Sequence, residues 1–130
     1  MSEQIKTIIQ SSIKVKEDLL KSDAMIAKLD EISNIIVTAF KNGNKVLFCG
    51  NGGSAADAQH FAAEFVGRYE RERPELAAIA LTTDSSILTA IANDYDFSVI
   101  YSKQVRALGQ AGDVLIAITT SGSSSNVLKA

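Results

Sequence analysis

Three polar stretches hold the residues that could do chemistry, and each follows a short apolar run. The first is Gly50-Asn51-Gly52-Gly53-Ser54, the second begins at Thr82-Thr83-Asp84, and the third spans residues 119–125, with six hydroxyl side chains in seven positions. Glycines let the backbone approach a ligand closely, and a helix that begins after such a loop presents free N–H groups. Hydroxyl and backbone donors together predict a site for a phosphomonoester that needs no lysine.

The first loop has two other interpretations. One is an ordinary tight turn, with Ser54 and Asp57 as a capping-box-like start of the next helix. The other is dinucleotide binding, because Gly50-x-Gly52-x-x-Ala55 formally fits a G-x-G-x-x-G/A fingerprint. That fingerprint also needs an acidic residue about 20 residues further on, whereas Asp84 lies more than 30 residues from Gly50. A P-loop is excluded because no Gly-Lys-Ser/Thr follows.

The third loop could instead be a flexible serine-rich linker. An apolar run leads directly into it, and Val127 and Leu128 follow it, which favours an ordered loop in a packed domain.

His60 and Glu64 are four residues apart, so both project from one face of a predicted helix. This spacing suits a shared metal or an acid–base pair, although such a pair is often a solvated surface contact. The apolar neighbours of Glu64 favour its burial.

The elements that must position these loops form a repeated pattern. Continuous apolar runs predict three strands covered on both faces, at Val46–Cys49, Ala77–Leu81 and Val114–Ile118. Helices are predicted over residues 55–66, over residues 85–93 with Asp84 as cap, and over residues 98–108, with a further helix starting near Asn126. Strand, loop and helix in repetition predict an α/β fold with a parallel sheet, whose loops meet at the carboxyl ends of the strands.

The first forty-odd residues follow a helical pattern. Apolar residues recur every three or four positions from Ile5 to Leu20 and again from Met25 to Phe40, with Ser22 or Asp23 as a cap between them. This predicts a helical hairpin over residues 1–42. Its apolar surface exceeds what a small sheet needs, so we expect packing between subunits.

The composition narrows the function classes. A chain of 130 residues fits one domain, and 13 Lys+Arg against 15 Asp+Glu give a net charge of -2, without the basic field that nucleic acids need. No apolar run approaches the ~20 residues that span a membrane, and no basic leader precedes an apolar block. A single cysteine, Cys49, excludes an internal disulfide. We therefore expect a protein of the cytoplasm that binds neither nucleic acid nor membrane.

The stretch from Cys49 to Glu64 resembles the sugar isomerase (SIS) domain family and, within it, is similar to the bacterial phosphoheptose isomerases. The likeness continues through residues 80–84, 91–95 and 104–109 and reaches Thr120-Ser121-Gly122 and Asn126-Val127. It implies a SIS-type doubly wound parallel sheet flanked by helices. It also implies a homotetramer that converts sedoheptulose 7-phosphate into D-glycero-D-manno-heptose 7-phosphate, the first step toward ADP-heptose and the lipopolysaccharide core.

The resemblance also assigns roles to individual residues. His60 and Glu64 match ligands of one zinc ion per subunit, and Glu64 also matches the base that moves a proton through an enediol. Zinc would polarise the substrate oxygens or hold the site together. The matched substrate-binding positions are Asn51, Gly52, Gly53, Ser54, Asn93, Asp94, Thr119, Thr120, Ser121 and Ser124.

Family members run further, with a Gln and a His that complete the zinc site. We therefore expect residues 45–130 to be the sugar-phosphate-binding part of a single domain over residues 1–130, without its C-terminal part, and residues 1–42 to serve oligomerisation. An alternative is a non-catalytic binding module like the DnaA initiator-associating protein, which shares the fold. Glu64, Gly53 and Asp57 favour the enzyme. A sugar-phosphate sensor is a third possibility.

Overall fold

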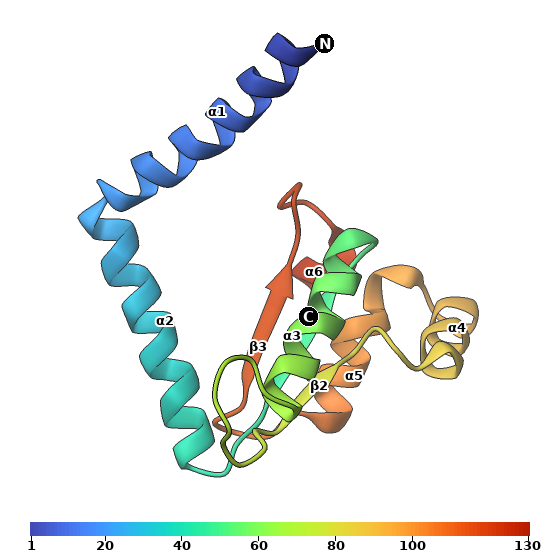
Figure 1. Ribbon diagram of the computed structural model, residues 1–130. Coiled ribbons are helices and arrows are strands. Elements are labelled where there is room, and N and C mark those ends of the chain that lie inside the picture. The colour runs from blue at the N-terminus through green and yellow to red at the C-terminus, as the bar shows by residue number, and fades with distance from the viewer. The chain divides into compact units, whose positions relative to one another are not determined.

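The computed structural model describes residues 1–130 as two compact units, residues 1–35 and residues 36–130. The first unit holds α1 (Ser2–Leu20) and most of α2 (Asp23–Lys41), so both predicted N-terminal helices are confirmed (Figure 1). Helix α1 buries no side chain. Its apolar stripe of Ile5, Ile8, Ile9 and Ile13 is 51 to 63% exposed, which leaves an apolar surface without a partner in the single chain.

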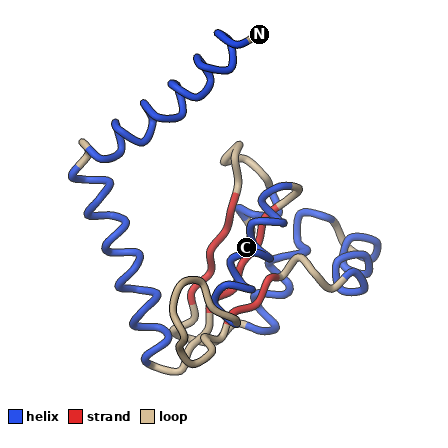
Figure 2. Tube along the Cα trace, viewed as in Figure 1, coloured by secondary structure: helices blue, strands red, loops and turns tan.

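The second unit contains a parallel sheet of three strands, β1 (Val46–Gly50), β2 (Ala78–Ala80) and β3 (Val114–Ile118). Their order is β2-β1-β3, so β1 is central and the chain crosses it between the second and third strands (Figure 2). This confirms the predicted α/β class. The crossover also places a topological switch point between β1 and β3, where ligands bind in sheets of this kind.

The helices of the second unit agree with the sequence prediction except at some ends. They are α3 (Gly53–Val66), α4 (Ser85–Asp94), α5 (Ile100–Leu108) and the short α6 (Ser125–Leu128). Asp84 caps α4 as predicted, since its Oδ1 accepts a hydrogen bond from the Ile87 amide at 2.9 Å. The stretch predicted as one helix over residues 98–108 begins as a 3-10 turn, η1 (Phe97–Val99), which the Asp96 carboxylate caps at the Ser98 amide.

Strand β1 is buried over its whole length and separates two apolar clusters. Val46 and Phe48 pack with Ala58 and Ala62 of α3, and the second half of α2 contributes Ile36 and Phe40. On the other face, Leu47 and Cys49 pack with Ile100 and Tyr101 of α5 and with Val127 of α6, and Leu88 and Ile91 of α4 contact the same cluster. Burial raises the pKa of the Cys49 thiol to about 11. Strand β1 is thus covered on both faces, as its continuous apolar run predicts. The same prediction is wrong for β2 and β3, which are only partly buried because they lie at the edges of the sheet, and Ile79 of β2 is 38% exposed.

No helix of the chain combines the length and the apolar character that crossing a membrane requires.

At the amino ends of β1 and β3, one carboxylate joins three segments. Asp113 accepts hydrogen bonds from the backbone and side-chain nitrogens of Lys45 at 3.0 and 2.5 Å and from the Gln110 amide at 2.8 Å. The Asp113 side chain is 6% exposed. These bonds, first the one from the Lys45 backbone, hold the pKa of the Asp113 carboxyl well below its usual range. The ionised carboxylate therefore fixes the start of β3 beside the start of β1.

We expect Asp113→Asn to lower the free energy of unfolding by about 2 kcal/mol at pH 7, the order of one charge-assisted hydrogen bond. A carboxyl with a depressed folded-state pKa stabilises the protein above its unfolded pKa, and this contribution is lost as pH falls. The difference between wild type and variant should therefore shrink from about pH 5 toward pH 2. Urea denaturation across this range measures it, with the exposed Asp57→Asn as control. An equal difference at pH 7 and pH 3 would contradict a role for the charge.

Candidate functional site

The loops after β1 and β3 lie side by side because their strands pair in parallel, with Gly50 opposite Ile118. Between them lies a small polar cavity of about 100 Å³. Its lining residues come from both loops and from the first turn of α3: Asn51, Ser54, Ile118, Thr119, Thr120 and Ser124. The first and third polar stretches of the sequence thus form one site, at the carboxyl ends of the strands as predicted and at the switch point between β1 and β3.

The first loop runs into α3 differently from the capping-box prediction, which is wrong. Gly52 is the N-cap, and no side chain accepts a capping hydrogen bond. Gly52 has φ +56°, a conformation that favours glycine, and this turn lets the helix begin at Gly53. Ser54 consequently lies inside the first turn, where it is buried against the cavity. The amides of Gly52 and Gly53 have no acceptor within the chain and are available to an anion.

Two buried side chains hold this loop from the core. The Tyr101 hydroxyl of α5 donates to the Gly50 carbonyl at 2.5 Å, and burial raises the pKa of the Tyr101 phenol. Asn51 and Asn126 exchange two side-chain hydrogen bonds, each of 2.8 Å. Sequence reasoning missed both contacts, because Tyr101 fits the apolar face of a helix and Asn126 only marked a helix start.

The hydroxyl groups of the third loop face one another across loose contacts. Thr119 Oγ1 lies 3.4 Å from both Ser121 Oγ and Ser124 Oγ. The Ser121 hydroxyl oxygen also accepts a hydrogen bond from the Ser123 backbone amide at 3.2 Å. These separations lie at or beyond the long end of the hydrogen-bond range, so the hydroxyl groups are weakly committed to each other. Gly122, with φ +67°, turns the loop at its tip. Several donors therefore converge where an anion could replace weak internal contacts.

His60 and Glu64 lie together, as their spacing predicts, with His60 Nε2 3.1 Å from Glu64 Oε1. The expected burial of Glu64 is wrong for the single chain, because its side chain is 34% exposed and that of His60 is 72% exposed. The reason is that this face of α3 opens on a separate pocket of about 460 Å³, which Phe61, Phe65 and Tyr69 also line. The pair does not line the hydroxyl-lined cavity between β1 and β3.

Arg73 closes the end of α3 next to this pair. Its guanidinium donates to the backbone carbonyls of Glu64 at 2.6 Å and of Phe65 at 2.9 Å. The last carbonyls of a helix lack partners within the helix, and a cation near them is favourable. Arg73 thereby fixes the backbone from which the Glu64 side chain projects.

Asn93 and Asp94 form the end of α4 and are exposed, with Asn93 Nδ2 donating to Asp94 Oδ1 at 2.8 Å. Neither residue lines the cavity between β1 and β3. Their predicted role in binding substrate stays a prediction, since the chain alone does not bring them to the two loops.

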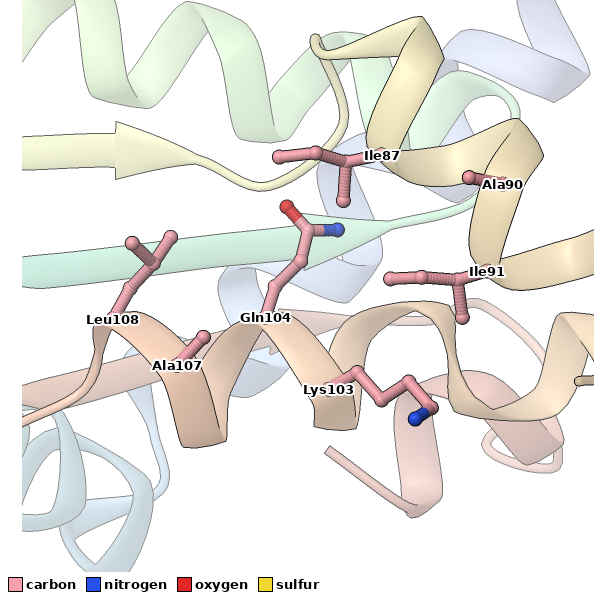
Figure 3. A pocket seen from close by; sticks show the side chains of 7 residues that line it. All are labelled: Ile87, Ala90, Ile91, Lys103, Gln104, Ala107 and Leu108. Atoms are coloured by element: carbon pink, nitrogen blue, oxygen red, sulfur yellow. The ribbon is translucent and has the colours of Figure 1, made fainter. Parts of the chain in front are cut away.

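A further pocket of about 440 Å³ lies between α4 and α5. Figure 3 shows Ile87 and Ile91 of α4 beside Gln104 of α5. The Gln104 amide is buried and donates to the carbonyls of Leu81 and Ile100, each at 3.0 Å. This pocket is almost wholly apolar, and none of the predicted site residues lines it.

The residues present do not make a complete zinc site. His60 and Glu64 offer an imidazole nitrogen and a carboxylate oxygen, donor types that zinc binds readily. Zinc in proteins takes three or four protein ligands, however, and no three His, Cys, Asp or Glu side chains of the chain gather in one place. The pair is at most part of such a site.

A parallel sheet with helices on both faces and a polar crevice at its switch point defines a doubly wound α/β ligand-binding domain. Residues 9–130 match the SIS domain family, so the chain belongs to that family.

The chain is similar to curated and solved members named as phosphoheptose isomerases. It is 77% identical over 88 residues to that of Methylibium petroleiphilum, covering 68% of this chain and 44% of the relative. It is 52% identical over 130 residues to that of Thermodesulfovibrio yellowstonii, covering all of this chain and 64% of the relative. The structure of the Neisseria gonorrhoeae protein aligns with a TM-score of 0.88 at 49% identity, over 98% of this chain and 65% of that one. The chain thus spans less than two thirds of these three proteins.

We expect Gly50→Ala to destabilise the protein by about 1 to 3 kcal/mol, the usual range for overpacking. A Cβ at Gly50 would lie 2.7 Å from the Ser54 carbonyl oxygen, and this backbone contact cannot move aside cheaply. Gly53→Ala is the matched control, since a Cβ there meets nothing within 4 Å. Thermal denaturation of both variants tests this close approach of the loop to α3. Equal melting temperatures for the two variants would contradict it.

Proposed function

We propose that the chain is the sugar-phosphate-binding part of a phosphoheptose isomerase, which converts sedoheptulose 7-phosphate into D-glycero-D-manno-heptose 7-phosphate. The observation that carries this proposal is the hydroxyl-lined cavity between β1 and β3, in a chain whose relatives bear that name. The cavity suits the phosphate group. Backbone amides of the first loop and hydroxyl groups of the third can bind it without lysine, in keeping with the net charge of -2.

The proposed reaction moves one proton between neighbouring carbons. Glu64 removes a proton from C1 of the ketose while the carbonyl oxygen at C2 gains one, which gives the enediol. The C1 hydroxyl then loses its proton as C1 becomes the carbonyl carbon, and Glu64 returns a proton to C2 to give the aldose. The electron pair passes through an enediol, whose developing negative oxygen needs a nearby positive charge or donor. Arg73 supports this role because it holds the Glu64 backbone at the end of α3.

We propose that His60 and Glu64 contribute two ligands to a zinc ion whose other ligands lie outside residues 1–130. Zinc would supply charge for the substrate oxygens or hold the site together. The proposal rests on the 3.1 Å approach of the imidazole to the carboxylate. Asn93 and Asp94 remain proposed substrate contacts on the strength of the family resemblance.

We also propose a homotetramer that works in the cytoplasm, on the route to ADP-heptose and the lipopolysaccharide core. The exposed apolar residues of α1 and α2 support assembly, since such a surface is costly to leave in water.

The alternative of a non-catalytic binding module like the DnaA initiator-associating protein is less favoured, because the similar proteins are named as isomerases.

We expect the Glu64→Gln change to reduce isomerisation at least 100-fold, because an amide cannot accept the proton. NMR of sedoheptulose 7-phosphate in deuterated water measures this and should show deuterium at C2 of the product made by the wild type. The experiment uses the 130-residue chain and any longer chain that its reading frame encodes. Glu70→Gln is the control, as this glutamate is exposed and lies outside both cavities. Full turnover by Glu64→Gln would rule out Glu64 as the base, and binding without turnover by the longer wild-type chain would favour the binding module.

We expect Ser124→Ala to weaken binding of sedoheptulose 7-phosphate about five- to tenfold, the effect of one lost hydrogen bond. Isothermal titration calorimetry gives the dissociation constant. The neighbouring Ser125→Ala is the matched control, because Ser125 is exposed and does not line the cavity. Equal losses in the two variants would place the phosphate elsewhere.

A further inference from the structure

Asn126 is a buried polar residue without an assigned role. It is 2% exposed, in the first turn of α6, and its neighbour Val127 packs into the apolar cluster that contains Leu47, Cys49 and Tyr101. Its side chain contacts a residue of the loop after β1, 75 positions earlier in the chain. A buried amide is costly unless its hydrogen bonds are satisfied, and Asn126 has a partner that satisfies them.

The partner is Asn51, and the contact uses both ends of both amides. Asn51 Nδ2 donates to Asn126 Oδ1, and Asn126 Nδ2 donates to Asn51 Oδ1, each at 2.8 Å. Two parallel hydrogen bonds fix the distance and also the rotation of one amide relative to the other. Because Val127 packs into the apolar cluster, the backbone of Asn126 is anchored, and the contact restrains the Asn51 side chain.

Asn51 lies between the two residues that set the path of the first loop into α3. The preceding residue, Gly50, is held by the Tyr101 hydroxyl, and the following residue, Gly52, turns the chain with φ +56° into α3. Asn51 lines the hydroxyl-lined cavity, whereas Asn126 does not. Any influence of Asn126 on a ligand must therefore pass through Asn51 and the loop.

We propose that Asn126 is a positioning residue, which holds Asn51 and the loop of residues 50–54 in the conformation that binds the phosphate of the substrate. The paired amide leaves Asn51 one free N–H for a ligand. The loop also keeps the amides of Gly52 and Gly53 free of internal acceptors. The role rests on the proposed sugar-phosphate binding, although the restraint on the loop is a property of the free protein as well.

The test compares near-isosteric changes of two buried amides. Asn126→Leu should weaken binding of sedoheptulose 7-phosphate and of inorganic phosphate about tenfold in calorimetry. Gln104→Met is the matched control, because Gln104 bonds to Leu81 and Ile100 instead of to the first loop. It should lower the melting temperature without changing either affinity. Wild-type affinity in a folded Asn126→Leu variant would overturn the proposal.

A double-mutant cycle separates positioning from a general loss of stability. If Asn126 acts through Asn51, adding Asn126→Leu to Asn51→Leu should produce no further loss of affinity. Losses that add in full would overturn the proposal. Asn126→Gln gives a second variant, which keeps the amide but moves it by one methylene. It should also weaken binding, and wild-type binding by this variant would count against the proposal.

An amide NMR spectrum of the free protein keeps the two proposals distinguishable. In Asn126→Leu the Gly52 and Gly53 signals should shift or broaden, while that of Gly43, in the turn after α2, should not. If the wild-type chain bound neither probe, the proposed function would fail. The glycine signals would still show whether Asn126 holds the loop, and unchanged signals would overturn that inference.

Discussion

The parallel pairing of β1 with β3 is the constraint on which the rest of the structure depends. It sets Gly50, the last residue of β1, opposite Ile118, the last residue of β3. The two loops that follow these strands therefore lie side by side, although they are more than sixty residues apart in the chain. The order β2-β1-β3 makes the carboxyl ends of β1 and β3 a switch point, because α3, which follows β1, and α6, which follows β3, pack on opposite faces of the sheet. The Asp113 network holds the other end of the same strand pair. A slip of this register would separate the residues that line the cavity.

The cavity between the loops after β1 and β3 offers neutral donors and no cation. Its lining side chains carry hydroxyl groups and one carboxamide, and the hydroxyl groups are only loosely bonded to each other. Because these internal contacts are weak, an anion could replace them at small cost in free energy. Neutral donors also discriminate by geometry more than by charge. This suits a ligand whose phosphate must be held at a fixed distance from a reacting carbon.

Much of this arrangement could be predicted from the sequence, because it follows from local patterns. Continuous apolar runs identified the three strands, and Asp84 marked where α4 begins. The helix predicted from residue 55 begins two residues earlier, at Gly53. Contacts that depend on tertiary approach could not be predicted. The Asn51–Asn126 pair and the Tyr101 bond to Gly50 join residues 75 and 51 positions apart, and no local pattern indicates either. The capping role given to Ser54 failed because the positive φ of Gly52 starts the helix earlier.

The single thiol has a consequence for how the molecule responds to its surroundings. Cys49 lies in the central strand, fully covered, and its pKa of about 11 leaves almost no thiolate at neutral pH. Electrophiles and oxidants react with the thiolate of a cysteine, so the Cys49 thiol of the folded chain is unreactive toward them. Cys49 can react only when β1 is locally unfolded. The rate of thiol modification therefore measures the local unfolding of β1, the strand that leads into the first loop.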